Sequence, residues 1–160
     1  MPKDRYAIAT EQPNPHTRGL DRLSALQIAR KINAEDFNAA RAVKKAAKPL
    51  AQAIRAAAQA FMGGHKIIFM GAGTSGRLGV LEAAECVPTF GVKPTQIIGL
   101  IAGGKNAMFR AKEGAEDNTA LGAQDIRQKA HAQDFVIGLT ASGITPYVLG
   151  GLEAARQLGA

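Results

Sequence analysis

The spacing of the apolar residues changes near residue 65 and divides the chain into two parts. In the first part, apolar residues recur every three or four positions over 23–32 and again over 43–61, which predicts amphipathic helices. Ser24 lies where it would begin the first, short helix, and Pro49 predicts a kink or two abutting helices in the second run. The Gly63–Gly64 pair predicts the end of this helical region.

In the second part, short apolar runs alternate with helical stretches. The apolar runs are KIIFM at 66–70, QIIGLI at 96–101 and FVIGL at 135–139. None of them alternates cleanly between apolar and polar residues, which is typical of strands buried on both faces. Helical stretches are expected at 75–84, 106–113, 119–131 and 145–158. This order predicts an α/β fold in which helices flank a parallel sheet with right-handed crossovers.

The same change of pattern predicts the domain organisation. Residues 1–64 form an N-terminal arm and helices, with the proline-containing stretch 1–18 extended, and residues 65–160 form the α/β domain. Three strands are few for such a sheet, and its edges are left exposed. We therefore expect either a partner chain that covers the edges or an incomplete domain that continues in a longer protein.

The composition narrows the function classes. No run is long and apolar enough to cross a bilayer, and the first residues lack the pattern of a signal peptide. Cys86 is the single cysteine, so we expect no internal disulfide, and the three histidines are too scattered for a metal site. The sequence predicts a cytoplasmic protein with no membrane partner and no metal.

The net charge of +7 at pH 7 raises the question of nucleic-acid binding. All of the surplus lies in residues 1–66, which hold 12 Lys and Arg against 5 Asp and Glu, whereas residues 67–160 hold 8 of each kind. Few aromatic residues accompany the basic ones, and single-strand binding normally needs aromatic rings on which bases stack. We expect a solvated basic helical face and no nucleic-acid partner.

A glycine-rich loop follows the first predicted strand. Residues 71–76 read GAGTSG, which matches the G-x-G-x-x-G pattern of dinucleotide-binding domains. That function requires an acidic residue after the next strand to hold a ribose hydroxyl, but residues 102–104 are Ala-Gly-Gly. The loop instead offers backbone amides, a helix N-terminus and the hydroxyls of Thr74 and Ser75, which suit a phosphate monoester. The alternative is that these hydroxyls only cap the helix.

A second hydroxyl-rich loop, TASGIT at 140–145, follows the third predicted strand. The carboxyl ends of parallel strands share one edge, so both loops are expected to face one crevice. Ser142 would then help to hold the same anion. Simple capping of the next helix by Ser142 or Thr145 is the alternative.

Two groups of carboxylates lie near this expected crevice. Glu85 is predicted at the end of the helix that begins at the glycine loop, whereas Glu82 is expected to be a surface charge. Glu113, Glu116 and Asp117 cluster around a glycine, Gly114, that is predicted to end a helix. Paired carboxylates in different environments suit proton transfer to and from carbon or oxygen. Solvated surface acids are the alternative.

These motifs together resemble one known family. The stretch MGAGTSGRLGVLEAAECVPTFGVKPTQIIGLIAGG, with KEGAEDN after it, closely resembles the N-acetylmuramic acid 6-phosphate etherases. The resemblance begins at TEQPNPHTRGLDRLSALQIARKINAED and continues through ASGITPYVLGGLEAARQLGA, so it covers essentially the whole chain. It implies the N-terminal part of the family chain and an incomplete sugar isomerase (SIS) fold, which the glucokinase regulatory protein shares.

The resemblance also implies a reaction. The sugar opens to its aldehyde, a carboxylate removes the adjacent proton, the lactyl ether is eliminated, and water adds to give N-acetylglucosamine 6-phosphate and D-lactate. By resemblance, Glu85 is the acid that helps lactate to depart and Glu116 is the candidate base. The residues implied to contact the sugar phosphate are Gly73, Thr74, Ser75, Gly76 and Ser142. No cofactor is implied, and the fold's relatives imply a homodimer.

Three departures from the family pattern qualify this resemblance. Val87 replaces a common proline beside Glu85, and Ile144 replaces a common arginine in the ASG-x-T-P-Y turn. The family's C-terminal half is absent from the sequence, together with any substrate contacts that it makes. A non-catalytic sugar-phosphate-binding module therefore stays open as a second hypothesis.

Overall fold

The computed structural model describes residues 8–160, and the chain separates into two compact units, with the division between Arg55 and Ala56. This division falls inside helix α2 (Ala47–Met62), whereas the boundary predicted at residue 64 lies just beyond that helix. The first seven residues of the predicted arm lie outside the described part.

The arm of the first unit is not extended throughout. It contains single 3-10 turns at η2 (Ala9–Glu11), η3 (Pro15–Thr17) and η4 (Leu20–Arg22). The η3 turn forms because the Asn14 side chain accepts a hydrogen bond from the N–H of His16 and Pro15 occupies the first position. Local side-chain bonds of this kind favour turns over extended backbone.

Helix α1 (Ala25–Lys45) is much longer than predicted. Ser24 caps it as expected, in a capping box with Gln27. The prediction of a short helix was wrong because no glycine or proline interrupts residues 25–45, so nothing ends the helix where the apolar spacing weakens.

The predicted break near Pro49 is confirmed as two abutting helices. Helix α1 ends at Lys45, Ala46 is a turn residue, and α2 begins at Ala47. A proline ring collides with the carbonyl four residues earlier, which here belongs to Lys45, so the break precedes Pro49. Helix α2 ends just before Gly63, also as predicted.

The second unit holds a parallel three-stranded sheet, as predicted. Its strands are β1 (Ile67–Gly71), β2 (Ile97–Ile101) and β3 (Phe135–Leu139), in the order β2-β1-β3. The apolar runs in the sequence located all three strands to within one residue. Because β1 is central, the loop that follows it lies between the loops that follow its two neighbours.

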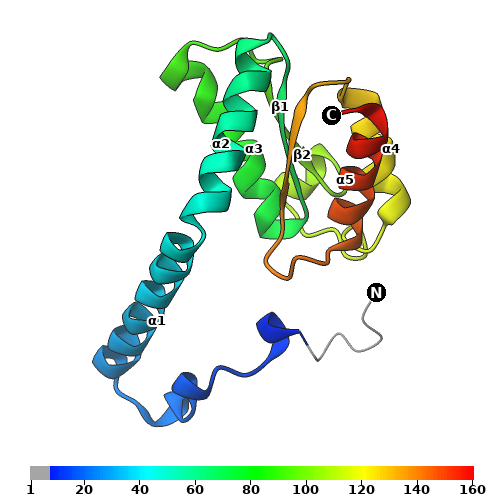
Figure 1. Cartoon of the computed structure of the whole chain (residues 1–160). Coiled ribbons are helices and arrows are strands. Elements are labelled where there is room, and N and C mark those ends of the chain that lie inside the picture. The colour runs from blue at the N-terminus through cyan, green and yellow to red at the C-terminus, as the bar shows by residue number, and fades with distance from the viewer. Residues whose placement is uncertain (1–7) are drawn as a thin grey trace. The chain divides into compact units, whose positions relative to one another are not determined.

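Helices cover both sides of this sheet (Figure 1). Helix α3 (Gly73–Phe90) packs on β1 and β2, while α4 (Thr119–Lys129) and α5 (Pro146–Leu158) pack together on the other side. Phe69 of β1 faces α3 at Gly79, and its neighbours Ile68 and Met70 belong to the core under α4 and α5. Alternate residues of a strand point to opposite faces, which accounts for this division.

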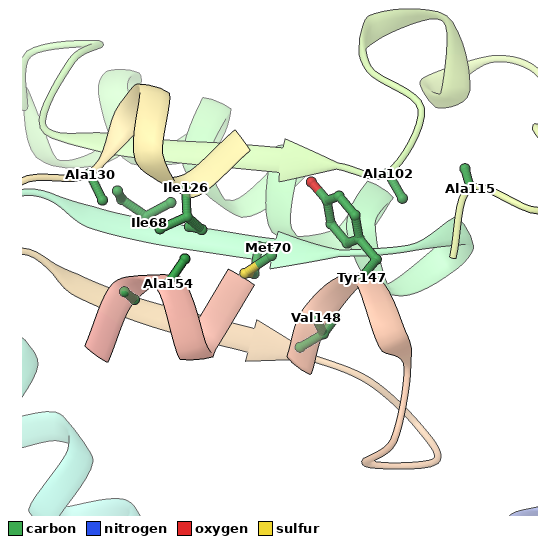
Figure 2. Packing of buried hydrophobic residues seen from close by; sticks show 10 residues of the cluster. Ile68, Met70, Ala102, Ala115, Ile126, Ala130, Tyr147, Val148 and Ala154 are labelled. Carbon is green, nitrogen blue, oxygen red and sulfur yellow. The ribbon is translucent and has the colours of Figure 1, made fainter. Parts of the chain in front are cut away.

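The hydrophobic core lies between the sheet and the pair α4 and α5. Figure 2 shows Ile68 and Met70 of β1 against Ile126 of α4 and Tyr147 of α5. All four side chains are fully buried. Burial of side chains of this size contributes about 1.5–3 kcal/mol each, so this cluster holds α4 and α5 firmly on the sheet.

Two predicted helices differ from the structure. Helix α3 runs on from 84 to Phe90, through Pro88, because the left-handed turn that ends it comes only at Gly91. The helix expected at 106–113 is a single 3-10 turn, η5 (Lys105–Met108), followed by turns, and Gly114 ends no helix. The Met108 carbonyl accepts a hydrogen bond from Nε of Arg77 instead of continuing a helical ladder.

Candidate active site at the carboxyl edge of the sheet

The register of the strands brings three loops to one edge. Gly71, the last residue of β1, lies beside Ile101 of β2 and Leu139 of β3, which are also the last residues of their strands. The loops at 72–76, 102–108 and 140–145 therefore leave the sheet side by side. This confirms that the two hydroxyl-rich loops share an edge.

The glycine loop packs tightly against the strand ends. A β-carbon at Gly76 would lie 2.5 Å from the carbonyl oxygen of Gly71 and 2.7 Å from the side chain of Ile101. Gly73 has a positive φ of 54°, which residues with side chains rarely adopt. The two glycines thus allow α3 to begin directly over the end of β1.

Thr74 and Ser75 do not cap α3, so the capping alternative fails there. The N-cap residue is Ala72, which makes no side-chain cap hydrogen bond. Thr74 and Ser75 are the second and third residues of the helix; Thr74 is exposed and Ser75 is half-buried. The first amides of a helix have no partner inside it, so this end of α3 combines free donors, a positive dipole and two hydroxyls.

The loop after β3 is organised by hydroxyl groups. Thr140 Oγ1 lies 2.7 Å from Thr145 Oγ1 and 3.4 Å from Ser142 Oγ, and it accepts a hydrogen bond from the N–H of Gly143. Ser142 Oγ accepts one from the N–H of Ile144. Thr145 is the N-cap residue of α5, but its side chain makes no cap hydrogen bond. The hydroxyls are therefore arranged around each other rather than used as helix caps.

Glu116 lies close to this second loop. It sits in the turn before α4, half-buried, and its backbone carbonyl accepts a hydrogen bond of 2.9 Å from the N–H of Tyr147. Tyr147 is the second residue of α5, which begins directly after the hydroxyl loop. The structure thus brings Glu116 and the loop of Ser142 together from positions far apart in the sequence.

Glu85 is not brought to the same place. It follows Ser75 by ten residues on α3, which corresponds to about 15 Å along the helix axis. Its side chain is exposed on the face that also carries Leu78 and Leu81, and both leucines are about half exposed. Within this chain, Glu85 therefore lies on an outward face of α3, away from the glycine loop.

Comparison with known proteins identifies the family. Residues 49–156 match the family described as the glucokinase regulatory protein N-terminal SIS domain. The chain belongs to this family of SIS domains. The matched segment contains all three strands, both hydroxyl-rich loops and both glutamates, so the whole edge described above is part of the SIS domain.

Curated relatives of this chain are named as N-acetylmuramic acid 6-phosphate etherases. The proteins from Lactobacillus acidophilus and Enterobacter sp. are 52% and 53% identical over 154 residues, and one from Vibrio cholerae is 50% identical. Each alignment covers 96% of this chain and 50–52% of the relative. The chain thus spans about half the length of the curated relatives that it matches.

Sequence reasoning missed two residues at this edge of the SIS domain. Arg77, half-buried on α3, joins the loops after β1 and β2 through its bond to the Met108 carbonyl. Its signal in the sequence was a basic residue directly after the glycine loop. Tyr147 was noted only as part of a family motif, because nothing in its spacing indicates that it reaches Glu116 and α4.

Across 8–160, no group of three or more His, Cys, Asp or Glu side chains lies close enough to hold a metal ion. In the same part of the chain, no helix combines the length and the apolar character that a membrane crossing requires. After β2, at Ala102 and Gly103, the structure has no carboxylate that would hold a ribose.

Proposed function

We propose that this SIS domain is part of an N-acetylmuramic acid 6-phosphate etherase, which produces N-acetylglucosamine 6-phosphate and D-lactate. The observation that carries the proposal is the identity of about half of all residues to relatives of that name, across the entire edge that holds the loops and glutamates. The activity belongs to a lyase of carbon–oxygen bonds. A role in cell-wall sugar recycling and a cytoplasmic location follow as predictions.

The phosphate group of the sugar is proposed to bind at the start of α3. The proposed ligands are the backbone amide of Gly73 and the hydroxyls of Thr74, Ser75 and Ser142. Gly76 completes the proposed site by allowing close packing of the loop, because its own N–H donates to the Ala72 carbonyl. The helix end lacks a side-chain cap, and an anion supplies the acceptors that its amides need. A phosphate monoester offers several acceptor oxygens to these neutral donors and carries the negative charge that a helix N-terminus favours.

Glu116 is proposed as the base that acts on the open-chain sugar. Its carboxylate takes the proton from the carbon beside the aldehyde, and the electron pair left behind forms a carbon–carbon double bond. The adjacent bond to the lactyl oxygen breaks as Glu85 gives that oxygen a proton, so lactate leaves. Water then adds across the double bond. Glu116 suits the first step because its turn is bonded to Tyr147, beside the loop that carries Ser142.

Glu85 is proposed to reach the substrate at a site completed by a second copy of the chain. It lies about 15 Å along α3 from Ser75, by the rise of an α-helix, and shares its outward face with the exposed Leu78 and Leu81. A second copy that covers these two leucines would also bring its surface next to the proposed acid. We therefore propose a homodimer, which light scattering would reveal at micromolar concentration.

The test is release of D-lactate from N-acetylmuramic acid 6-phosphate, followed with a coupled D-lactate dehydrogenase. Steady release by the protein, dependent on the 6-phosphate, is the expected result. Binding of the sugar phosphate without D-lactate would instead favour the non-catalytic module. Protection against melting by a nicotinamide dinucleotide, and none by the sugar phosphate, would contradict both.

A further inference from the structure

The first turn of α5 is capped by a distant backbone group. The N-cap residue Thr145 makes no cap hydrogen bond, because its hydroxyl is paired with Thr140, and Pro146 has no N–H. The N–H of Tyr147 is therefore the first donor of the helix, and the carbonyl of Glu116 accepts it at 2.9 Å. The main chain of the proposed base takes the place of a cap.

The side chain of Tyr147 makes a second connection to the same region. It is fully buried, and its hydroxyl donates a hydrogen bond of 2.7 Å to Oδ2 of Asp125 on α4 (Figure 2 shows the ring beside Ala102 and Ala115). Burial and the neighbouring carboxylate raise the pKa of Tyr147 far above its usual range, so the hydroxyl keeps its proton. Tyr147 thus holds both the turn before α4 and the second turn of α4.

Helices α4 and α5 approach each other closely near Tyr147. A β-carbon at Gly122 of α4 would overlap the carbonyl oxygen of Tyr147, and one at Gly150 of α5 would overlap that of Thr119. Glycine at both positions lets the helices touch through their backbones. Ala115, next to Glu116, is buried in the same core.

We propose that Tyr147 is a positioning residue for Glu116: its N–H and its hydroxyl together set the distance between the proposed base and the hydroxyl loop. The inference rests on the proposed function. Tyr147 follows Ser142 by five residues, so one short segment carries the proposed phosphate ligand of this loop at one end and holds the turn of the proposed base at the other. A displaced base loses rate even when the substrate still binds.

The test compares Tyr147→Phe with matched variants in the intact protein. Tyr147→Phe keeps the N–H and the ring and removes only the bond to Asp125. Asp125→Ala removes the same bond from the other side, whereas Asp125→Asn keeps an acceptor oxygen. Leu152→Ala is the control for destabilisation, because Leu152 packs α5 on Gly138 of β3 and has no bond to the Glu116 turn.

We expect Tyr147→Phe and Asp125→Ala to lower kcat about ten- to hundredfold with KM within about twofold. Asp125→Asn and Leu152→Ala should keep kcat within about twofold of the parent protein. An equal loss of kcat in Leu152→Ala, or an unchanged kcat in Tyr147→Phe, would overturn the proposal and leave Tyr147 a purely structural residue.

Hydrogen exchange of the Tyr147 amide provides a readout that does not need turnover. In Tyr147→Phe, protection of this amide and of residues 115–122 should fall at least about tenfold relative to Leu152→Ala, because the turn opens locally. Unchanged protection would overturn the positioning role. If the parent protein itself releases no D-lactate, the proposed function fails, and the exchange result still decides whether Tyr147 holds the turn.

Discussion

The hydroxyl oxygens of Thr140 and Thr145 lie 2.7 Å apart and close the loop that carries Ser142. Thr140 Oγ1 also accepts a hydrogen bond from the N–H of Gly143 and lies 3.4 Å from Ser142 Oγ. One hydroxyl group therefore contacts three other residues of the six-residue loop. Thr140 comes directly after the last residue of β3, which makes the strand a rigid base for this network. The position of Ser142 therefore depends on a residue that the family resemblance did not single out.

Replacement of Thr140 by valine should weaken sugar-phosphate binding. The change keeps the shape and removes the hydroxyl, so the N–H of Gly143 and the hydroxyl of Thr145 lose their partner. A net hydrogen bond is worth about 1 kcal/mol, and calorimetric titration should show an affinity lowered about three- to thirtyfold. Thr95→Val is the control, since Thr95 is exposed at the amino end of β2. Equal affinity in the two variants would argue against the loop as the anion site.

Replacement of Glu85 by glutamine should remove activity without affecting the fold. Loss of a general acid costs about a hundredfold to ten-thousandfold in rate, while the exposed position of Glu85 predicts an unchanged melting temperature. Glu82→Gln is a close control, because Glu82 is exposed on the same helix and has the same charge. Near-normal D-lactate release by Glu85→Gln would remove Glu85 from the mechanism.

Replacement of Glu116 by glutamine should abolish proton removal while the turn stays in place. The bond to Tyr147 uses the backbone carbonyl of Glu116, which the substitution keeps. We expect kcat to fall about a hundredfold or more, and exchange of the substrate's carbon-bound proton with deuterated water to stop. Glu113 is an exposed residue in the preceding turn, so Glu113→Gln should retain both the kcat and the proton exchange of the parent protein. Continued proton exchange in Glu116→Gln would assign the base elsewhere.

Substitution of alanine for Gly76 should disrupt binding more than its effect on stability explains. The new methyl group would press on the Gly71 carbonyl and on Ile101 and push the start of α3 off the strand ends. Overpacking of this kind costs about 1–3 kcal/mol. Gly79→Ala, one turn later, meets only the side chains of Phe69 and Leu139. Both variants should have a lower melting temperature, but affinity for the sugar phosphate should fall in Gly76→Ala alone. An equal loss of affinity in both variants would mean that general destabilisation, and not the glycine loop, accounts for the effect.

The sheet could be predicted from the sequence because its strands are short apolar runs that no helix pattern competes with. The same reasoning failed at 106–113, where the decision between helix and turn depends on the bond from Arg77 to Met108, a contact across 31 residues. For α1 the error was the opposite one, because the predicted helix was too short. Local helix propensity extends α1 to Lys45, beyond the residues with clear apolar spacing.

For the candidate site, the sequence predicted which loops share an edge but not how Glu116 and Glu85 lie relative to them. The order of strands places the loops of Ser75 and Ser142 at one edge, and this follows from a parallel sheet alone. The link between Glu116 and Tyr147 is a backbone contact, which leaves no signal in side-chain identity. Helical rise shows why Glu85 lies away from Ser75, and that distance could have been calculated from the sequence once the helix was assumed.

Asp134 should matter for stability and not for binding, because it lies at the opposite edge of the sheet. Its carboxylate is 4% exposed and accepts hydrogen bonds from the N–H groups of Lys66 and His131, at 2.7 and 2.8 Å. These residues precede β1 and β3, so Asp134 joins the amino ends of the two strands.

Asp134→Ala leaves both N–H groups without an acceptor, and the Lys66 ammonium, 3.8 Å away, without its counter-charge. We expect the free energy of unfolding to fall by about 2–5 kcal/mol, measured by urea denaturation. Asp134→Asn keeps one acceptor oxygen and should lose less. At a temperature where both variants stay folded, their affinity for the sugar phosphate should equal that of the parent protein, because the loops at the carboxyl edge rest on strand ends that neither change touches. A specific loss of affinity in folded Asp134→Asn would show that the two edges of the sheet are coupled, and the binding site would then have to be sought beyond the three loops.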